Sequence, residues 1–153
     1  MNNPSIQIRE GRPEDATIIA DYNRRMALET EGKELDSEIV GKGVAQGLLH
    51  PEKCCYFVAE TQGSVIGQAM VTYEWSDWRN GDLWWIQSVY VHPDHRRQGI
   101  FKRLYQHIET LARENKNVRG LRLYVEEENE AGQTVYKKLG MSHAGYHVYE
   151  REF

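Results

Sequence analysis

The sequence predicts an α+β fold, in which helices cover both faces of a mixed, mostly antiparallel sheet of about seven strands. Short apolar runs of strand type are separated by glycine turns at 62–63 and 80–81, and such turns favour antiparallel neighbours. Apolar residues recur at helical spacing in other segments, which indicates amphipathic helices. One strand also continues through a loop and a helix into a further strand, and such a crossover pairs the two strands in parallel.

The composition describes one globular domain over residues 1–153, with 40% hydrophobic and 27% charged residues. A net charge of −4 argues against a general nucleic-acid binder, and no apolar run approaches the length of a membrane span. The first residues lack the cationic and apolar regions of a signal peptide. Cys54 and Cys55 are adjacent, which suits neither a disulfide framework nor a metal site. We therefore expect a cytoplasmic protein that binds no metal, nucleic acid or membrane.

The N-terminal third predicts one strand and two helices. Apolar and polar residues alternate over 6–8, which is typical of a short strand. Residues 13–28 carry an apolar helical stripe behind an initial proline. After a polar link, Asp36 or Ser37 can cap a second helix that ends near Leu49.

The middle of the chain predicts an antiparallel hairpin that leads into a central strand. Residues 56–59 and 65–73 have the composition of strands, and Asn80-Gly81 marks a reversal into the fourth strand. That strand should stop near His92, because Pro93 cannot continue a sheet ladder.

The C-terminal part predicts two helices and three strands. From Phe101 the apolar residues follow helical spacing, and apolar residues alternate over 121–125 as a fifth strand. A short helix begins at Asn129. Two short strands, at Met141–Ala144 and Tyr146–Arg151, complete the expected seven.

A short basic loop around Gly99 lies between the fourth strand and its helix. A helix N-terminus presents free backbone N–H groups and a partial positive charge, and a glycine there lets an anion approach the backbone. The pattern predicts a phosphate or pyrophosphate cradle, and a solvated basic turn is the alternative interpretation. The four cations of this loop are Arg96, Arg97, Lys102 and Arg103.

Two motifs resemble those of the GNAT superfamily of acetyl-CoA-dependent N-acetyltransferases. In the acetyl-CoA-binding loop Arg96, Gly99 and Ile100 fit the family pattern. Phe101 stands where the family prefers glycine or alanine. A second segment is similar to another family signature. This chain has Gly132 where the signature has alanine, and Met141 where it has phenylalanine. The segment comprises Asn129, Gly132, Tyr136, Leu139, Gly140 and Met141.

The resemblance implies acetyl-CoA as co-substrate and transfer of its acetyl group to a primary amine by direct attack in a ternary complex. It makes Tyr136 the catalytic acid, since the pKa of tyrosine is close to that of an alkyl thiol; a core tyrosine is the alternative interpretation. A backbone N–H of Val89 or Tyr90 would stabilise the oxyanion. The expected cofactor-binding residues are Val89, Tyr90, Val91, Arg96, Arg97, Gln98, Gly99, Ile100, Phe101, Lys102, Asn129 and Tyr136.

Acidic and aromatic side chains in two places are candidates for binding the acceptor, a small-molecule or peptide amine. One is the acidic link between the first two helices, and the other is the tryptophan-rich hairpin. A solvated acidic loop, and a hydrophobic cap or homodimer surface, are the respective alternatives. The candidate substrate residues are Glu29, Glu74, Trp75, Asp77 and Trp85.

The general base has no clear candidate. Gln87 takes the position at which many family members have a glutamate, and a glutamine cannot serve as a base. This difference and Phe101 keep open a non-catalytic acyl-CoA-binding or sensor domain on the same fold. A protein-interaction module that uses the tryptophan-rich hairpin is a further alternative.

Overall fold

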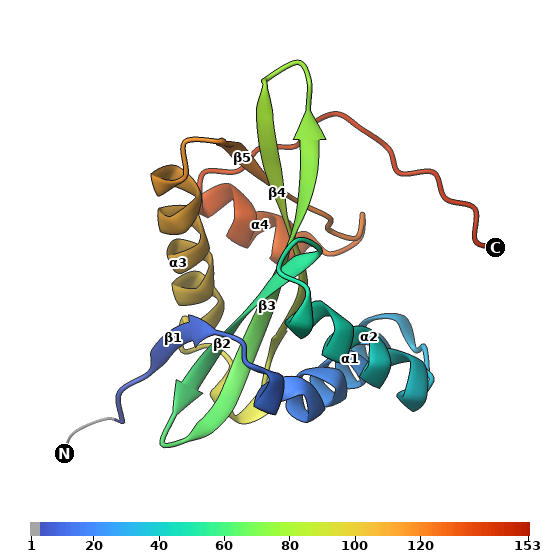
Figure 1. Ribbon diagram of the computed structural model, residues 1–153, viewed down its shortest axis with the longest axis vertical. Coiled ribbons are helices and arrows are strands. Elements are labelled where there is room, and N and C mark those ends of the chain that lie inside the picture. Colours follow the sequence, from blue (N-terminus) through green and yellow to red (C-terminus); the bar gives the residue numbers. More distant parts are fainter. Residues whose placement is uncertain (1–3) are drawn as a thin grey trace.

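The computed structural model describes residues 4–153, so residues 1–3, which begin the segment without a signal-peptide pattern, lie outside the described residues. Short 3₁₀ turns precede the first and third helices, at Pro13–Asp15 and Pro93–His95. The elements in chain order are β1 (Gln7–Glu10), α1 (Ala16–Glu31), α2 (Ser37–Leu49), β2 (Cys54–Thr61), β3 (Ser64–Ser76), β4 (Gly81–Val91), α3 (Ile100–Glu114), β5 (Val118–Leu123) and α4 (Glu130–Lys138) (Figure 1).

The strands form one open sheet in the order β1-β2-β3-β4-β5. Neighbours are antiparallel except β4 and β5, which run parallel on either side of the α3 crossover. The prediction of a mixed, mostly antiparallel sheet with one crossover is therefore confirmed. The β3–β4 hairpin pairs from Gly67↔Val91 to Ser76↔Gly81, and its turn projects beyond the rest of the sheet in Figure 1.

The expected number of strands was wrong, because the described residues form five strands rather than seven. Residues 142–153 were expected to supply most of the last two, but they belong to no strand and extend away from the body (Figure 1). Tyr146 and Val148 alternate as a strand would, yet both are exposed. A strand pair is marginal unless one face is buried, and this segment covers no core surface.

Helices cover both faces of the sheet, as expected. On one face α3 buries Ile100, Leu104 and Ile108, which follow one another at four-residue spacing. On the other face α1 and α2 pack Ile19 and Val44 against β2. The predicted cap of α2 is also present, since the Asp36 carboxylate accepts from the backbone N–H groups of Glu38 and Ile39. The sheet is thus sandwiched between two apolar layers.

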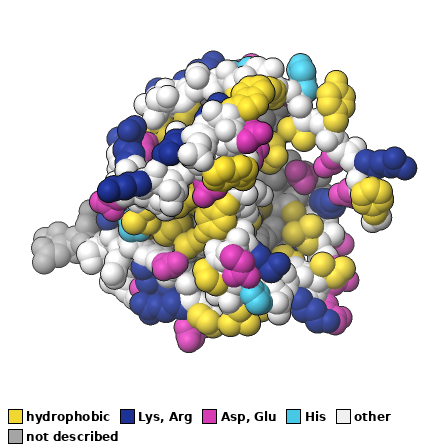
Figure 2. Space-filling view, turned by 45° about the horizontal axis from the view of Figure 1, so that its top comes forward, with side chains coloured by type: hydrophobic (Ala, Val, Ile, Leu, Met, Phe, Trp, Pro, Cys, Tyr) yellow, Lys and Arg dark blue, Asp and Glu magenta, His cyan; other side chains and the backbone are white. Residues whose placement is uncertain are grey.

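The surface mixes charge of both signs. On the face shown in Figure 2, hydrophobic side chains gather in the middle, with basic and acidic side chains interspersed around them. Within residues 4–153, no helix combines the length and the apolar character needed to cross a bilayer.

Candidate functional site

The turn from β4 into α3 is the centre of the candidate site. Gly99 is the N-cap of α3 and has a φ of +74°, a conformation that glycine adopts without strain. A Cβ placed on Gly99 would meet no atom within 4 Å, so the backbone there is open on one side. Ile100 is buried in the core and anchors the first turn. The helix therefore presents its N-terminal N–H groups beside an accessible glycine.

Arg96 in this loop is held by α1 as well as by β4. Its Nη2 lies 2.7 Å from Oε2 of Glu29, and its Nε donates to the carbonyl of Val91 at 2.9 Å. Tyr90 donates to the other Glu29 oxygen at 2.9 Å, and the guanidinium carbon lies 5.3 Å from the Tyr90 ring centroid. The hydrogen bond from Arg96 lowers the pKa of Glu29. Glu29 was expected in the acceptor site, and in the structure it pairs with Arg96 of the loop before α3.

The rest of the loop is exposed. Arg97 has a φ of +64°, and Gln98 Nε2 donates to the carbonyl of Asp94 at 3.4 Å. Lys102 follows in the first turn of α3 and is exposed. These side chains can turn toward a bound anion without losing a buried contact.

β4 carries a bulge where it leaves its neighbours. Ser88 and Val89 together oppose Ala69, because Gln87 pairs with Met70 and Tyr90 pairs with Gln68. Ser88 has a φ of +51°, which is unusual for a residue other than glycine. The pairing with β5 ends at Ile86↔Leu123, so the strand beyond the bulge diverges from β5. Beyond this point β4 has no strand partner on the β5 side, which leaves the backbone of Val89 open there, whereas the Val91 carbonyl accepts from Arg96 and Tyr90 pairs with Gln68 of β3.

α4 brings Tyr136 against α3, and Asn129 begins the helix. Asn129 caps α4 by accepting from the N–H of Gly132 at 2.9 Å. A Cβ on Gly132 would lie 2.7 Å from Asn129 Nδ2, so the alanine of the family signature would need Asn129 to shift. The Tyr136 ring lies edge-on to Phe101, with centroids 5.8 Å apart, and burial raises the pKa of Tyr136. Phe101 thus points along α3 toward the expected catalytic acid.

The hairpin candidates lie among partners that the sequence did not indicate. Glu74 is ion-paired with Arg122 of β5 at 3.0 Å, and Trp85 stacks on Tyr124 with centroids 4.5 Å apart. Trp75 is 63% exposed. Asp77 lies in the exposed turn of the hairpin. Trp85 and Glu74 are thus joined through Arg122, whose guanidinium also lies 5.9 Å from the Trp85 ring centroid.

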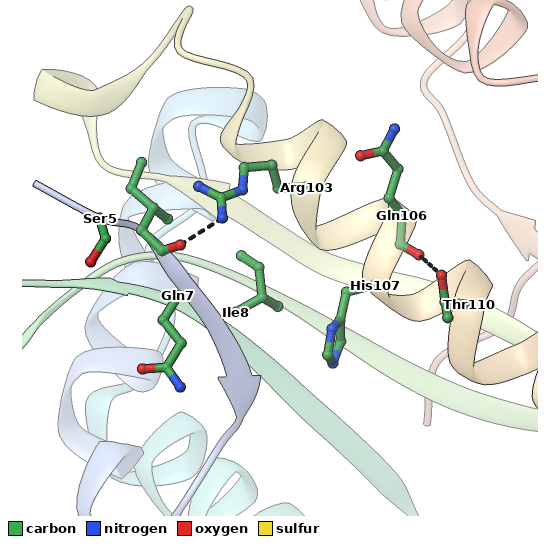
Figure 3. A pocket seen from close by; sticks show the side chains of 8 residues that line it. Ser5, Gln7, Ile8, Arg103, Gln106, His107 and Thr110 are labelled. Carbon is green, nitrogen blue, oxygen red and sulfur yellow. Dashed lines mark hydrogen bonds between the residues drawn. The ribbon is translucent and has the colours of Figure 1, made fainter. Parts of the chain in front are cut away.

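Two other hollows contain none of these residues. A groove of about 660 Å³ runs between β1 and α3, where Arg103 donates to the backbone of Ile6 (Figure 3). A smaller cavity of about 280 Å³ lies under the C-terminal end of α3, beside Cys55. Within residues 4–153, no group of three or more His, Cys, Asp or Glu side chains is arranged to hold a metal ion.

Residues 16–141 match the sequence model of the acetyltransferase (GNAT) family. Because this match spans most of the chain, the protein belongs to the GNAT acetyltransferase family, as the two motifs indicated. The match includes the Gly99 loop, the β4 bulge and α4.

Solved structures agree with this assignment. A possible acetyltransferase from Clostridium difficile 630 is 47% identical, with 97% of each chain covered and a TM-score of 0.91. A predicted acetyltransferase from Clostridium acetobutylicum, solved with acetyl-CoA, is 19% identical over 96% of each chain with a TM-score of 0.79, and therefore shares the fold. A thialysine N-epsilon-acetyltransferase from Bos taurus is 30% identical over 82 residues, or 53% of this chain. The match spans about half of that relative, 47% of its length.

Proposed function

We propose that this protein is an N-acetyltransferase that moves an acetyl group from acetyl-CoA to a primary amine. The observation that carries the proposal is the open Gly99 turn at the N-terminus of α3, placed beside the diverging end of β4. Positive φ, free N–H groups and neighbouring cations together suit a diphosphate. The free cysteines suit a reducing compartment, so we place the enzyme in the cytoplasm.

The chain's residues fit acetyl-CoA in three places. The backbone of Gly99 and Ile100, with Arg97, Gln98 and Lys102, would hold the diphosphate. The free edge of β4 at Val89–Val91 would hold the pantetheine arm by backbone hydrogen bonds. Asn129 and Phe101 would border the arm from α4 and α3.

In the proposed reaction the amine nitrogen attacks the thioester carbonyl, and the carbon–sulfur bond then breaks. A backbone N–H of Val89 or Tyr90 stabilises the negative charge on the carbonyl oxygen. The hydroxyl of Tyr136 donates a proton to the departing thiolate, and the proton that the amine loses passes through water to restore the Tyr136 hydroxyl. Its raised pKa keeps Tyr136 protonated through the neutral range, as an acid requires. Trp85, Glu74, Trp75 and Asp77 are proposed to line the acceptor side.

The proposal is tested by isothermal titration with acetyl-CoA, with CoA and ATP as controls. We expect acetyl-CoA and CoA to bind and ATP not to bind, since the pantetheine arm supplies contacts that ATP lacks. Thiol release with a panel of amines then measures transfer. Absence of acetyl-CoA binding at high micromolar concentration would overturn the proposal.

One observation favours a second candidate, a non-catalytic acyl-CoA sensor. Gln87, at the position of the family glutamate, donates from its Nε2 to Thr72 Oγ1 at 2.6 Å and cannot take a proton from an amine. Tight acetyl-CoA binding without thiol release across the whole amine panel would support the sensor and exclude the enzyme.

A further inference from the structure

Two buried amide side chains lie directly beneath the β4 bulge. Gln68 of β3 is completely buried, and Asn23 of α1 is 7% exposed. Gln68 Nε2 donates to Asn23 Oδ1 at 2.9 Å and to the backbone carbonyl of Ser88 at 3.1 Å. Both amide hydrogens of Gln68 are thus used, and the bulge is tied through β3 to helix α1.

Stability of the fold alone does not explain a glutamine at position 68. Oε1 of Gln68 is buried and has no hydrogen-bond partner among residues 4–153. A buried acceptor without a donor destabilises the folded state, because it loses its hydrogen bond to water. An apolar side chain of similar size would avoid this loss, but it would leave Asn23 Oδ1 and the Ser88 carbonyl without their donor. The amide therefore has a role at the atoms that it contacts.

The contact with Ser88 controls a peptide group at the candidate site. Ser88 adopts a φ of +51°, a conformation that a residue other than glycine keeps only when its surroundings hold it there. The carbonyl of Ser88 and the N–H of Val89 belong to one planar trans peptide, so they point in opposite directions. A hydrogen bond that fixes this carbonyl also fixes the direction of the Val89 N–H, one of the two candidate oxyanion donors.

We propose that Gln68, supported by Asn23, is a positioning residue that orients the Ser88–Val89 peptide for acetyl transfer. This inference rests on the proposed function, because the oriented N–H matters only if a thioester is bound there. Gln68 itself does not contact the reacting atoms; it acts through Ser88. Asn23 fixes the Gln68 amide from α1, so its own effect is smaller than that of Gln68.

The test is the substitution Gln68→Met, which keeps the volume and removes both hydrogen bonds and the orphan oxygen. We expect a modest loss of thermal stability, because Asn23 Oδ1 and the Ser88 carbonyl both lose their donor. We expect the Kd for acetyl-CoA to change by less than about threefold. We expect kcat for thiol release to fall by about tenfold to a hundredfold, because a small displacement of an oriented group has that effect. Asn23→Ala should lower kcat in the same direction by less.

Backbone NMR gives a readout that does not need turnover. We expect Gln68→Met to change the three-bond HN–Hα coupling of Ser88 and the amide chemical shifts of Val89. The matched control is Val71→Ala, a fully buried change in β3 on the α3 face of the sheet, which should lower stability and leave kcat and both signals as they were. The inference is overturned if Gln68→Met keeps wild-type kcat and coupling, or if Val71→Ala, at a similar loss of stability, lowers kcat as much as Gln68→Met does.

Failure of the proposed function would be recognised separately. If the wild-type protein neither binds acetyl-CoA nor releases thiol, the transferase proposal fails. The Ser88 coupling and the Val89 amide shifts then still decide whether Gln68 holds the bulge.

Discussion

Substitution of Gly99 separates the strain of the α3 turn from anion binding. Gly99 has a φ of +74°, and a Cβ there would meet no atom within 4 Å. Alanine therefore causes no clash, and its effect on stability comes from the left-handed backbone, roughly 1–2 kcal/mol. We expect Gly99→Ala to lower the free energy of unfolding by that amount and to weaken acetyl-CoA binding, because the methyl group occupies space that the anion would use.

Gly63 provides the matched control for this substitution. It lies in the β2–β3 turn with a φ of +77°, and a Cβ there also meets no atom within 4 Å. Gly63→Ala should thus lower stability as much as Gly99→Ala does, and it should leave the Kd for acetyl-CoA unchanged.

Gly99→Glu adds a charge at the same point. The glutamate carboxylate would then lie close to the diphosphate of bound acetyl-CoA. Two like charges about 4 Å apart repel by about 4 kcal/mol at the effective dielectric constant of a protein surface. Since about 1.4 kcal/mol corresponds to a tenfold change, the Kd should rise by about a hundredfold to a thousandfold.

The assay is isothermal titration at one fixed salt concentration, with thermal unfolding of each variant measured in parallel. A Kd for Gly99→Glu within twofold of wild type would refute the anion cradle. Equal loss of affinity in Gly63→Ala and Gly99→Ala would also refute it, because the effect would then follow stability alone.

The remaining predictions concern the catalytic acid, a buried ion pair and a helix cap. Tyr136→Phe should slow thiol release by about a hundredfold or more while the Kd for acetyl-CoA stays the same. Because burial raises the pKa of Tyr136, deprotonation of this acid should lower the wild-type rate only at a pH above the ordinary pKa of tyrosine. Asp15→Asn should lower stability by about 3 kcal/mol, because it breaks the paired contact with Arg9 at 2.7 and 3.0 Å. That contact lowers the pKa of Asp15 below its ordinary 3.8, so its contribution is present at neutral pH and is lost as pH falls below about 3.8 through the folded-state pKa. Asp36→Ala should cost about 1 kcal/mol through loss of the α2 cap, measured by urea unfolding.

Each of these predictions has an outcome that contradicts it. Tyr149→Phe in the exposed C-terminal segment is the control for Tyr136→Phe, and equal rates in the two variants would remove the acid role. A stability difference between wild type and Asp15→Asn that persists undiminished at pH 2 would show that Asp15 is not the titrating group. An Asp36→Ala variant as stable as wild type would mean that water replaces the cap.

Much of the fold was predictable because its determinants are local. The Asp36 cap, the four-residue spacing of Ile100, Leu104 and Ile108, and the Asn80-Gly81 reversal each act within a few residues. Gly99 belongs to the same class, since its position between a strand and a basic helix already predicted a backbone that an anion can approach, and the structure adds its positive φ. Such features follow from short-range hydrogen bonding and sterics, which the order of residues specifies directly.

The partners of the site were decided by tertiary structure. Glu29 and Arg96 are 67 positions apart, and no periodicity links them, so their ion pair became visible only when α1 was packed beside the loop. Ser88 gave no signal of a bulge, because serine rarely adopts a positive φ unless other residues hold it.

The last twelve residues show that a local sequence pattern does not by itself produce a strand. Two strands were expected at Met141–Ala144 and Tyr146–Arg151 and neither forms, because a strand forms only against an edge and a core that it can cover. The sequence by itself thus determined the helices, the β3–β4 hairpin, the crossover through α3, the Gly99 loop and the family. Packing decided which strands exist, which side chains hold the loop and how the β4 bulge is supported, because burial and long-range pairing depend on the whole chain.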